Sequence, residues 1–163
     1  MDRGRLLTEL ELRGLPHSYA VAIDRRDVAG LLELFLPDAL LTVVRSAHEP
    51  PEEYCGHAGL PGLFDALDGI EMTMHSVLAH QVDIDGDRAT GEVACVAHHV
   101  SRKSGNEGSD FVVYLRYYDA LRAGRGRALA LRQSAARVRL DRGARGPPRP
   151  LGEVRSEAVS QRA

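Results

Sequence analysis

The residues with the clearest potential for chemistry begin with one histidine, His75. Val77 and Ala79 follow it at the strand period of two, so the strand face that carries His75 is predicted to be buried or to line a pocket. Ser76 and His80 then fall on the opposite face. A buried imidazole needs a partner for its second nitrogen, and a carboxylate partner makes it a stronger base, so an acidic residue should lie nearby.

Asp24 is the best candidate for that carboxylate. It lies in the last turn of the predicted first helix, where the macrodipole disfavours a carboxylate by roughly a few tenths of a kcal/mol, so another group should hold it there. It follows Tyr19 by five residues and borders the apolar face of this helix. The alternatives are a surface ion pair of Asp24 with Arg25 or Arg26, and a core His75 bonded to a backbone carbonyl.

Two adjacent histidines, His98 and His99, lie on another predicted strand and must point to opposite faces. Only one of them can share a pocket with His75. A metal site built from His75, His80 and one of this pair would need residues on opposite faces to converge, and no HxH or HxxxH spacing supports it, so we expect no metal. The sequence also has no GxSxG elbow, Walker loop or GxGxxG helix start, which leaves nucleophilic and nucleotide chemistry without support.

The length and composition of the chain indicate one domain followed by a tail. Residues 1–141 are predicted to form the domain, and residues 142–163, rich in Gly, Pro, Arg, Ala and Ser, are predicted to be disordered. The net charge of −2 gives no reason to expect nucleic acid or an anionic membrane as a partner. No apolar run approaches the roughly 18 residues of a membrane span, and the cysteines form no CxxC pair, so we expect a cytoplasmic protein without a disulfide or zinc framework.

Hydrophobic periodicity predicts helices first and strands after, which is an α+β order. The first helix covers residues 4–24 and is expected either to kink or to divide at Pro16. A second helix follows an Asp27 N-cap, and a tight turn at Asp85–Gly86 joins two strands. This second helix covers Val28–Phe35, and a third is predicted at Gly59–Asp68. The predicted strands are Ala39–Arg45 and about 71–84, 88–102, 110–122 and 127–140. Leu36–Asp38 and Glu49–Glu53 are predicted to lie outside helices and strands.

The predicted strand at 110–118 has apolar or aromatic residues on both faces. A one-domain protein uses only one of these faces for a pocket. We therefore expect a homodimer that covers the outer face. The two alternating sets are Phe111, Val113, Leu115 and Tyr117, and Val112, Tyr114, Arg116 and Tyr118.

Several stretches of the chain are similar to the SnoaL-like group of the NTF2-like superfamily, which includes polyketide cyclases, scytalone dehydratase, bile-acid dehydratase and a dehydrochlorinase. These stretches are Tyr19–Asp27, Leu31–Ala39, His75, Ile84–Gly91 and Ala97–His99, and the resemblance extends over about residues 5–140. It implies an α+β conical barrel, in which helices pack against a strongly curved, mostly antiparallel sheet and enclose an apolar pocket.

The same resemblance implies roles for individual residues. In scytalone dehydratase and the dehydrochlorinase, an Asp at the position of Asp24 pairs with a His at the position of His75, and a second His of the dehydratase matches His99. The pocket tyrosines of the dehydratase are replaced here by Ile23 and Val43, which departs from its dehydration chemistry. The residues expected to contact a substrate are Tyr19, Ile23, Val43, Tyr117 and Arg132.

These observations lead to one functional expectation and two alternatives. We expect a cofactor-independent acid–base enzyme, a cyclase, dehydratase or isomerase, that acts on a small hydrophobic, polyketide-like or terpenoid-like metabolite. Asp24 would orient His75, His75 would abstract a proton, and His99 would donate a hydrogen bond or a proton to a substrate oxygen. The alternatives are a non-catalytic ligand-binding or dimerisation module, and an epoxide-opening enzyme for which Asp119 is the spare carboxylate.

Overall fold

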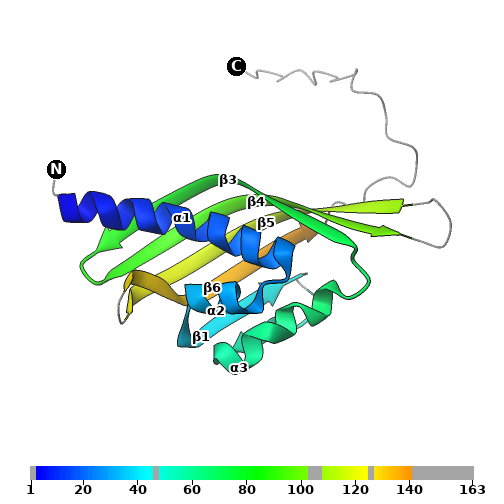
Figure 1. Cartoon of the computed structure of the whole chain (residues 1–163), viewed down its shortest axis with the longest axis horizontal. Helices are drawn as coiled ribbons and strands as arrows, with labels where there is room; N and C mark the ends of the chain where they lie inside the picture. Colours follow the sequence, from blue (N-terminus) through cyan, green and yellow to red (C-terminus); the bar gives the residue numbers. More distant parts are fainter. Residues whose placement is uncertain (1–2, 46–47, 103–107, 125–126, 141–163) are drawn as a thin grey trace, which may run out of the picture.

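The computed structural model describes residues 3–45, 48–102, 108–124 and 127–140, and for residues 102, 123–124, 127–130 and 132–140 it describes the backbone alone. Within these ranges, helices pack on a six-stranded sheet (Figure 1). The predicted tail, residues 142–163, lies outside the described residues, so its disorder remains a prediction.

One long helix, α1 (Arg3–Arg25), opens the chain and continues through Pro16. The predicted alternative of two short helices is therefore wrong. A proline inside a helix removes a backbone hydrogen bond and costs about 3 kcal/mol. The helix continues because Pro16 is itself buried, together with Leu12, Ala20 and Ile23, on the side that packs against the sheet, so burial offsets the lost bond.

The second helix, α2 (Val28–Leu34), begins at the predicted N-cap. The Oδ1 atom of Asp27 accepts a hydrogen bond of 2.9 Å from the backbone N–H of Gly30, which satisfies one of the free donors of the first turn. The helix ends before Phe35, the residue at which it was predicted to end, because a strand starts there.

The first two strands differ most from the prediction. The strand β1 (Phe35–Val44) starts directly after α2 and includes Pro37, which was predicted to lie outside it. The strand β2 (Glu52–Cys55) pairs antiparallel with β1, so the predicted loop Glu49–Glu53 is wrong in its second half. A short edge strand with charged residues carries little of the hydrophobic alternation from which strands are predicted.

The segment after β2 forms short turns in place of the single helix predicted at 59–68. These turns are α3 (Gly56–Gly59) and two 3₁₀ segments, η1 (Leu60–Leu63) and η2 (Asp65–Leu67). Pro61 lies at the start of η1, where its missing N–H prevents α3 from continuing as a regular helix. None of the helices in the described ranges is both long and apolar enough to cross a membrane.

Four long strands agree closely with the prediction and form most of the sheet. The order across the sheet is β2-β1-β6-β5-β4-β3, and every pairing is antiparallel except that of β1 with β6. Figure 1 shows α1 and α2 lying across one face of this open sheet, which confirms the α+β class. The four strands are β3 (Met72–Asp85), β4 (Arg88–Arg102), β5 (Gly108–Gly124) and β6 (Arg127–Leu140).

A β-bulge in β3 reverses the sheet face to which the side chains after Leu78 were predicted to point. The pairing of β3 with β4 shifts between Val77 and Ala79, so Leu78 is an extra residue in the strand. Beyond it, Ala79 is exposed and His80 is half-buried. The prediction that Ala79 shares the face of His75 and that His80 lies opposite is therefore wrong, because one added residue shifts the period of two.

The inner face of the sheet and the packed sides of α1 and α2 form one hydrophobic core. Both cysteines are free, with Cys95 in this core and Cys55 exposed at the end of β2. The largest fully buried side chains are Leu12, Leu31, Leu41, Leu60 and Val93.

Two glycines give opposite expectations when each is replaced by alanine. Gly56 has a φ of +61°, and an added Cβ would lie 2.8 Å from the carbonyl oxygen of Pro37, so Gly56→Ala should lower the free energy of unfolding by about 1–3 kcal/mol. Gly14 lies inside α1 with nothing within 4 Å of an added Cβ, so Gly14→Ala should raise the free energy of unfolding by about 1 kcal/mol. Urea unfolding measures both. Equal stability of the two variants would contradict the backbone assigned to Gly56.

Candidate active site

The carboxylate of Asp24 and the imidazole of His75 meet between the end of α1 and the start of β3. The Nδ1–H group of His75 donates to Asp24 Oδ1 at 2.7 Å, and the backbone N–H of His75 donates to Asp24 Oδ2 at 2.9 Å. Both carboxylate oxygens therefore bind one residue that lies 51 positions along the chain. These two bonds supply the donors that the carboxyl end of a helix does not offer to Asp24.

The hydrogen bond to the carboxylate fixes the tautomer of His75. A carboxylate accepts hydrogen bonds, so Nδ1 carries a proton, and in the neutral ring Nε2 is then the nitrogen with the free lone pair. The side chain of His75 is 7% exposed and that of Asp24 is 24% exposed, so the contact is largely shielded from water. His75 also lines a pocket between the helices and the sheet. The geometry thus leaves Nε2 of His75 as the ring nitrogen that can exchange a proton with a bound molecule.

His99 is the histidine of the adjacent pair that lies near His75. The two rings are 5.9 Å apart between centroids and meet edge to face at 73°. His98 points to the other face of β4, where its Nδ1 lies 2.7 Å from Asp110 Oδ2. The strand period alone could not assign which histidine faces inward, and the register of β4 against β3 and β5 places His99 there.

The surroundings of His99 favour its neutral form. Burial lowers the pKa of this imidazole, and the neighbouring His75 lowers it further. Its Nδ1 atom is buried and forms no hydrogen bond of standard length and angle with the described residues, and the backbone of Phe111 makes only a weaker hydrogen-bonding contact with the ring. A neutral imidazole can still donate one hydrogen bond, so His99 is suited to bind an oxygen atom rather than to carry a permanent charge.

A pocket of about 230 Å³ opens beside the two histidines. Six of the residues predicted for the site line it, namely Tyr19, Ile23, Val43, His75, His99 and Tyr117. Asp24 lies behind His75 and does not line this pocket. The backbone of Arg132 belongs to β6, but its side chain lies outside the described part of the structure, so its predicted contact with a substrate remains a prediction.

The pocket has further lining residues that the sequence did not identify as part of a site. The alternation of β5 could have indicated three of them, since they share the face of Tyr117. No alternation of this kind identifies Arg45 or the residues of the turns after β2. The side chain of Arg45 binds Glu52 through two hydrogen bonds of 2.7 and 3.0 Å. The additional lining residues are Arg45, Leu63, Ala66, Leu67, Ile70, Phe111, Val113 and Leu115.

A second, much smaller cavity of about 20 Å³ adjoins the pocket and shares Tyr19, His75 and Tyr117 with it. The rings of Tyr19 and Tyr117 meet edge to face at 5.6 Å. Burial raises the pKa of both phenols, and it raises the pKa of Cys95 to about 11. These groups keep their protons near neutral pH, so Cys95 is poorly suited to act as a nucleophile. Asp119 also lines this small cavity.

The histidines do not assemble into a metal site in the described part of the chain. No group of three or more His, Cys, Asp or Glu residues within these ranges is placed to hold a metal ion. The bulge turns His80 inward, but His80 lines a separate open hollow with Arg13 and Asp83.

The fold and the site define a class of protein, a small α+β domain in which helices and a mostly antiparallel sheet surround an apolar pocket with an Asp–His pair. The sequence matches the SnoaL-like domain family over residues 4–128, and the chain belongs to this family. The family and the fold class expected from the sequence are therefore confirmed. A comparison with curated proteins gave no match.

Solved structures share the fold at low sequence identity. A candidate scytalone dehydratase from Novosphingobium aromaticivorans DSM 12444 is 16% identical with a TM-score of 0.70, over 94% of this chain and 99% of that one. The hexachlorocyclohexane dehydrochlorinase LinA-type3 from Novosphingobium barchaimii LL02 is 14% identical with a TM-score of 0.68, over 89% and 97%. The Kfla4162 protein from Kribbella flavida is 19% identical with a TM-score of 0.71, over 85% and 95%.

The burial of two histidines, His80 and His99, leads to a prediction of how the free energy of unfolding depends on pH. Burial lowers the pKa of both His80 and His99. Between each lowered value and the unfolded value of about 6.5, the unfolded chain binds more protons, so the free energy of unfolding should fall as the pH drops below about 6.5. Urea unfolding between about pH 8 and 5.5 measures this dependence, and His99→Gln should flatten it. Greater stability at the lower pH would contradict the assignment.

Proposed function

We propose that this protein is a cofactor-independent acid–base enzyme, a cyclase, dehydratase or isomerase, in which Asp24 and His75 act as a dyad. The observation that supports this most directly is the 2.7 Å hydrogen bond between Asp24 Oδ1 and His75 Nδ1 at the wall of an apolar pocket. A buried core histidine would need only one backbone partner, whereas this one has a carboxylate behind it and open space beside it.

The reaction begins when Nε2 of His75 removes a proton from a carbon atom of the substrate. Asp24 holds the ring in the required tautomer and stabilises the imidazolium that forms. His99, as a neutral donor, binds the substrate oxygen on which negative charge develops or which departs. General acid–base assistance of this kind typically contributes about 10²- to 10⁴-fold in rate for each group.

The substrate we propose is small and hydrophobic, with the character of a polyketide or terpenoid. The pocket lining supports this, since aliphatic and aromatic side chains surround a few polar groups. Two of the solved structures that share the fold are named as a candidate dehydratase and a dehydrochlorinase, and both names describe eliminations. Proton abstraction by His75 is the step that an elimination shares with a cyclisation or an isomerisation.

The dyad can be tested without the natural substrate by proton exchange into D₂O from 2-tetralone, a small bicyclic ketone. Asp24→Asn should reduce the exchange rate by about 10² or more, because an amide occupies the same space but cannot stabilise the imidazolium. His75→Gln should be at least as damaging. The double variant should be scarcely slower than either single one, since residues that act as a unit are strongly non-additive. Proton NMR measures the rates.

A second Asp–His pair of the same length provides the matched control. His98 and Asp110 are also 2.7 Å apart, but they lie on the outer face of the sheet, so Asp110→Asn and His98→Gln should leave exchange unchanged. Near-normal exchange in Asp24→Asn and His75→Gln would show that the dyad mechanism is wrong. Binding of 2-tetralone with no exchange in the unmodified protein would favour the non-catalytic binding module.

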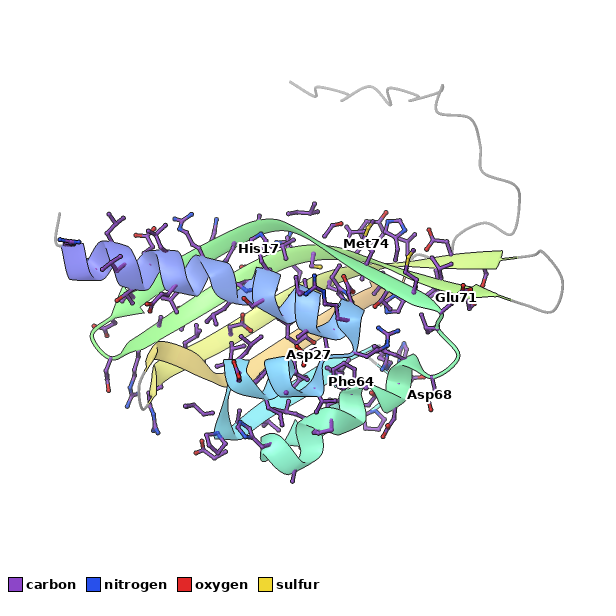
Figure 2. The ribbon with its side chains drawn as sticks, in the orientation of Figure 1. His17, Asp27, Phe64, Asp68, Glu71 and Met74 are labelled. Carbon is purple, nitrogen blue, oxygen red and sulfur yellow. The ribbon has the colours of Figure 1, made fainter. Side chains whose placement is uncertain are left out.

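We also propose that the protein forms a homodimer through the outer face of the sheet. Tyr114 and Tyr118 on β5 and Met72 and Met74 on β3 are 42–51% exposed. Figure 2 shows Met74 projecting from β3 toward solvent. Exposed aromatic and thioether groups gathered on one sheet face are typical of a covered interface.

Sedimentation at micromolar concentration tests the dimer. The unmodified protein should sediment as a dimer, and Tyr114→Glu should sediment as a monomer because it places a charge in the interface. Leu10→Glu is the control, because Leu10 is 57% exposed on α1, away from that face, and the variant should remain dimeric. A monomeric unmodified protein would refute the proposal.

A further inference from the structure

Arg26 has an unusual backbone conformation directly after the first helix. Its φ is +57°, and it is the one residue other than glycine with a positive φ in the described ranges. The Arg26 N–H donates to the Ile23 carbonyl at 3.1 Å and the Asp27 N–H donates to the Ala22 carbonyl at 2.8 Å, which is the bonding pattern of a Schellman cap. Glycine is favoured at the left-handed position of this cap, so the side chain of arginine calls for a separate explanation.

The guanidinium of Arg26 connects three segments of the chain. Its Nη1 donates to the Ile23 carbonyl and to Thr73 Oγ1, both at 2.8 Å, and its Nη2 donates to the Ile70 carbonyl at 3.4 Å. Ile23 and Ile70 line the pocket beside the two histidines. The same side chain therefore ties the end of α1 to β3 and to the residues just before β3.

Thr73 brings this contact next to both histidines. It is 4% exposed and lies two residues before His75 on the inner side of β3. In the register of β3 and β4 it is the direct partner of His99. A side chain bonded to Thr73 thus lies close to the dyad and to His99 without lining the pocket itself.

We propose that Arg26 is a positioning residue of the candidate active site, which holds Asp24 in register with His75 and, through its bond to Thr73, places a fixed positive charge beside His99. The catalytic consequence rests on the proposed function. The effect of Arg26 on the protonation of His99 does not, because a positive charge acts on that ring whatever reaction the pocket supports.

The groups around His99 act on its protonation in both directions. After burial and the neighbouring His75, the positive charge of Arg26 also lowers the pKa of His99. The backbone of Phe111 and the carboxylate of Asp24 raise it. Removal of the charge at position 26 should therefore let His99 bind a proton at higher pH, and a charged His99 would oppose proton uptake by His75.

The first test is an NMR titration of the histidine rings in the full chain, with the signals of His99 identified by their loss in His99→Gln. Arg26→Gly and Arg26→Gln should raise the pKa of His99, whereas Arg26→Lys should keep it near the original value. Arg25→Gln neutralises the neighbouring, exposed arginine and should not change it. An unchanged titration of His99 in both Arg26→Gly and Arg26→Gln would overturn the proposal.

The second test is 2-tetralone exchange with the same variants. Arg26→Gln should slow the exchange by about 10-fold, with its acid limb moved to higher pH, while Arg25→Gln should match the unmodified protein. Thr73→Val removes the acceptor of the Arg26 bond at nearly constant volume, so it should also slow the exchange. It tests the same contact in the event that the Arg26 variants fold poorly. Full-rate exchange in both Arg26→Gln and Thr73→Val would overturn the positioning role. If Asp24→Asn leaves exchange unchanged, the proposed function fails, and the titration of His99 still decides the effect of the Arg26 charge.

Discussion

The contact between Asp24 and His75 depends on the meeting of two elements that lie far apart in the sequence. A carboxylate at the carboxyl end of a helix is unfavourable, and a buried imidazole N–H without an acceptor is unfavourable as well. Each group resolves the problem of the other, but only when the last turn of α1 lies in register with the start of β3. The packing of α1 on the sheet and the bonds from Arg26 to Thr73 and Ile70 provide that register.

The apolar surroundings of this pair concentrate the acid–base chemistry on a few groups. Burial raises the pKa values of Tyr19, Tyr117 and Cys95, so their protons stay in place near neutral pH. Burial lowers the pKa of His99, which removes a competing positive charge from the pocket. A hydrogen bond to a charged group is also stronger where water is excluded. The proposed division of roles between a proton acceptor and a neutral donor follows from this environment.

Irregular features of the fold shape the walls around the site. The bulge at Leu78 breaks the alternation of side chains that begins at His75. As a result, His80 points inward and lines a hollow separate from the pocket of His75. The short turns after β2 place Leu63, Leu67 and Ile70 against the pocket, where one straight helix was expected. These features depend on single residues such as Pro61, whose missing N–H interrupts regular structure.

The sequence by itself determined the α+β class, the four long strands, the Asp27 cap and the residue types able to form an acid–base pair. Each of these follows from local periodicity or from a side chain bonding to its own backbone, and both are visible over a few residues. Tertiary structure decided that α1 passes unbroken through Pro16, that Glu52–Cys55 is a strand, and that His80 turns inward while His99 lies beside His75. It also decided the contacts of Arg26 and Arg45. These outcomes depend on pairing register and on burial between distant segments, and no local pattern in the sequence encodes either.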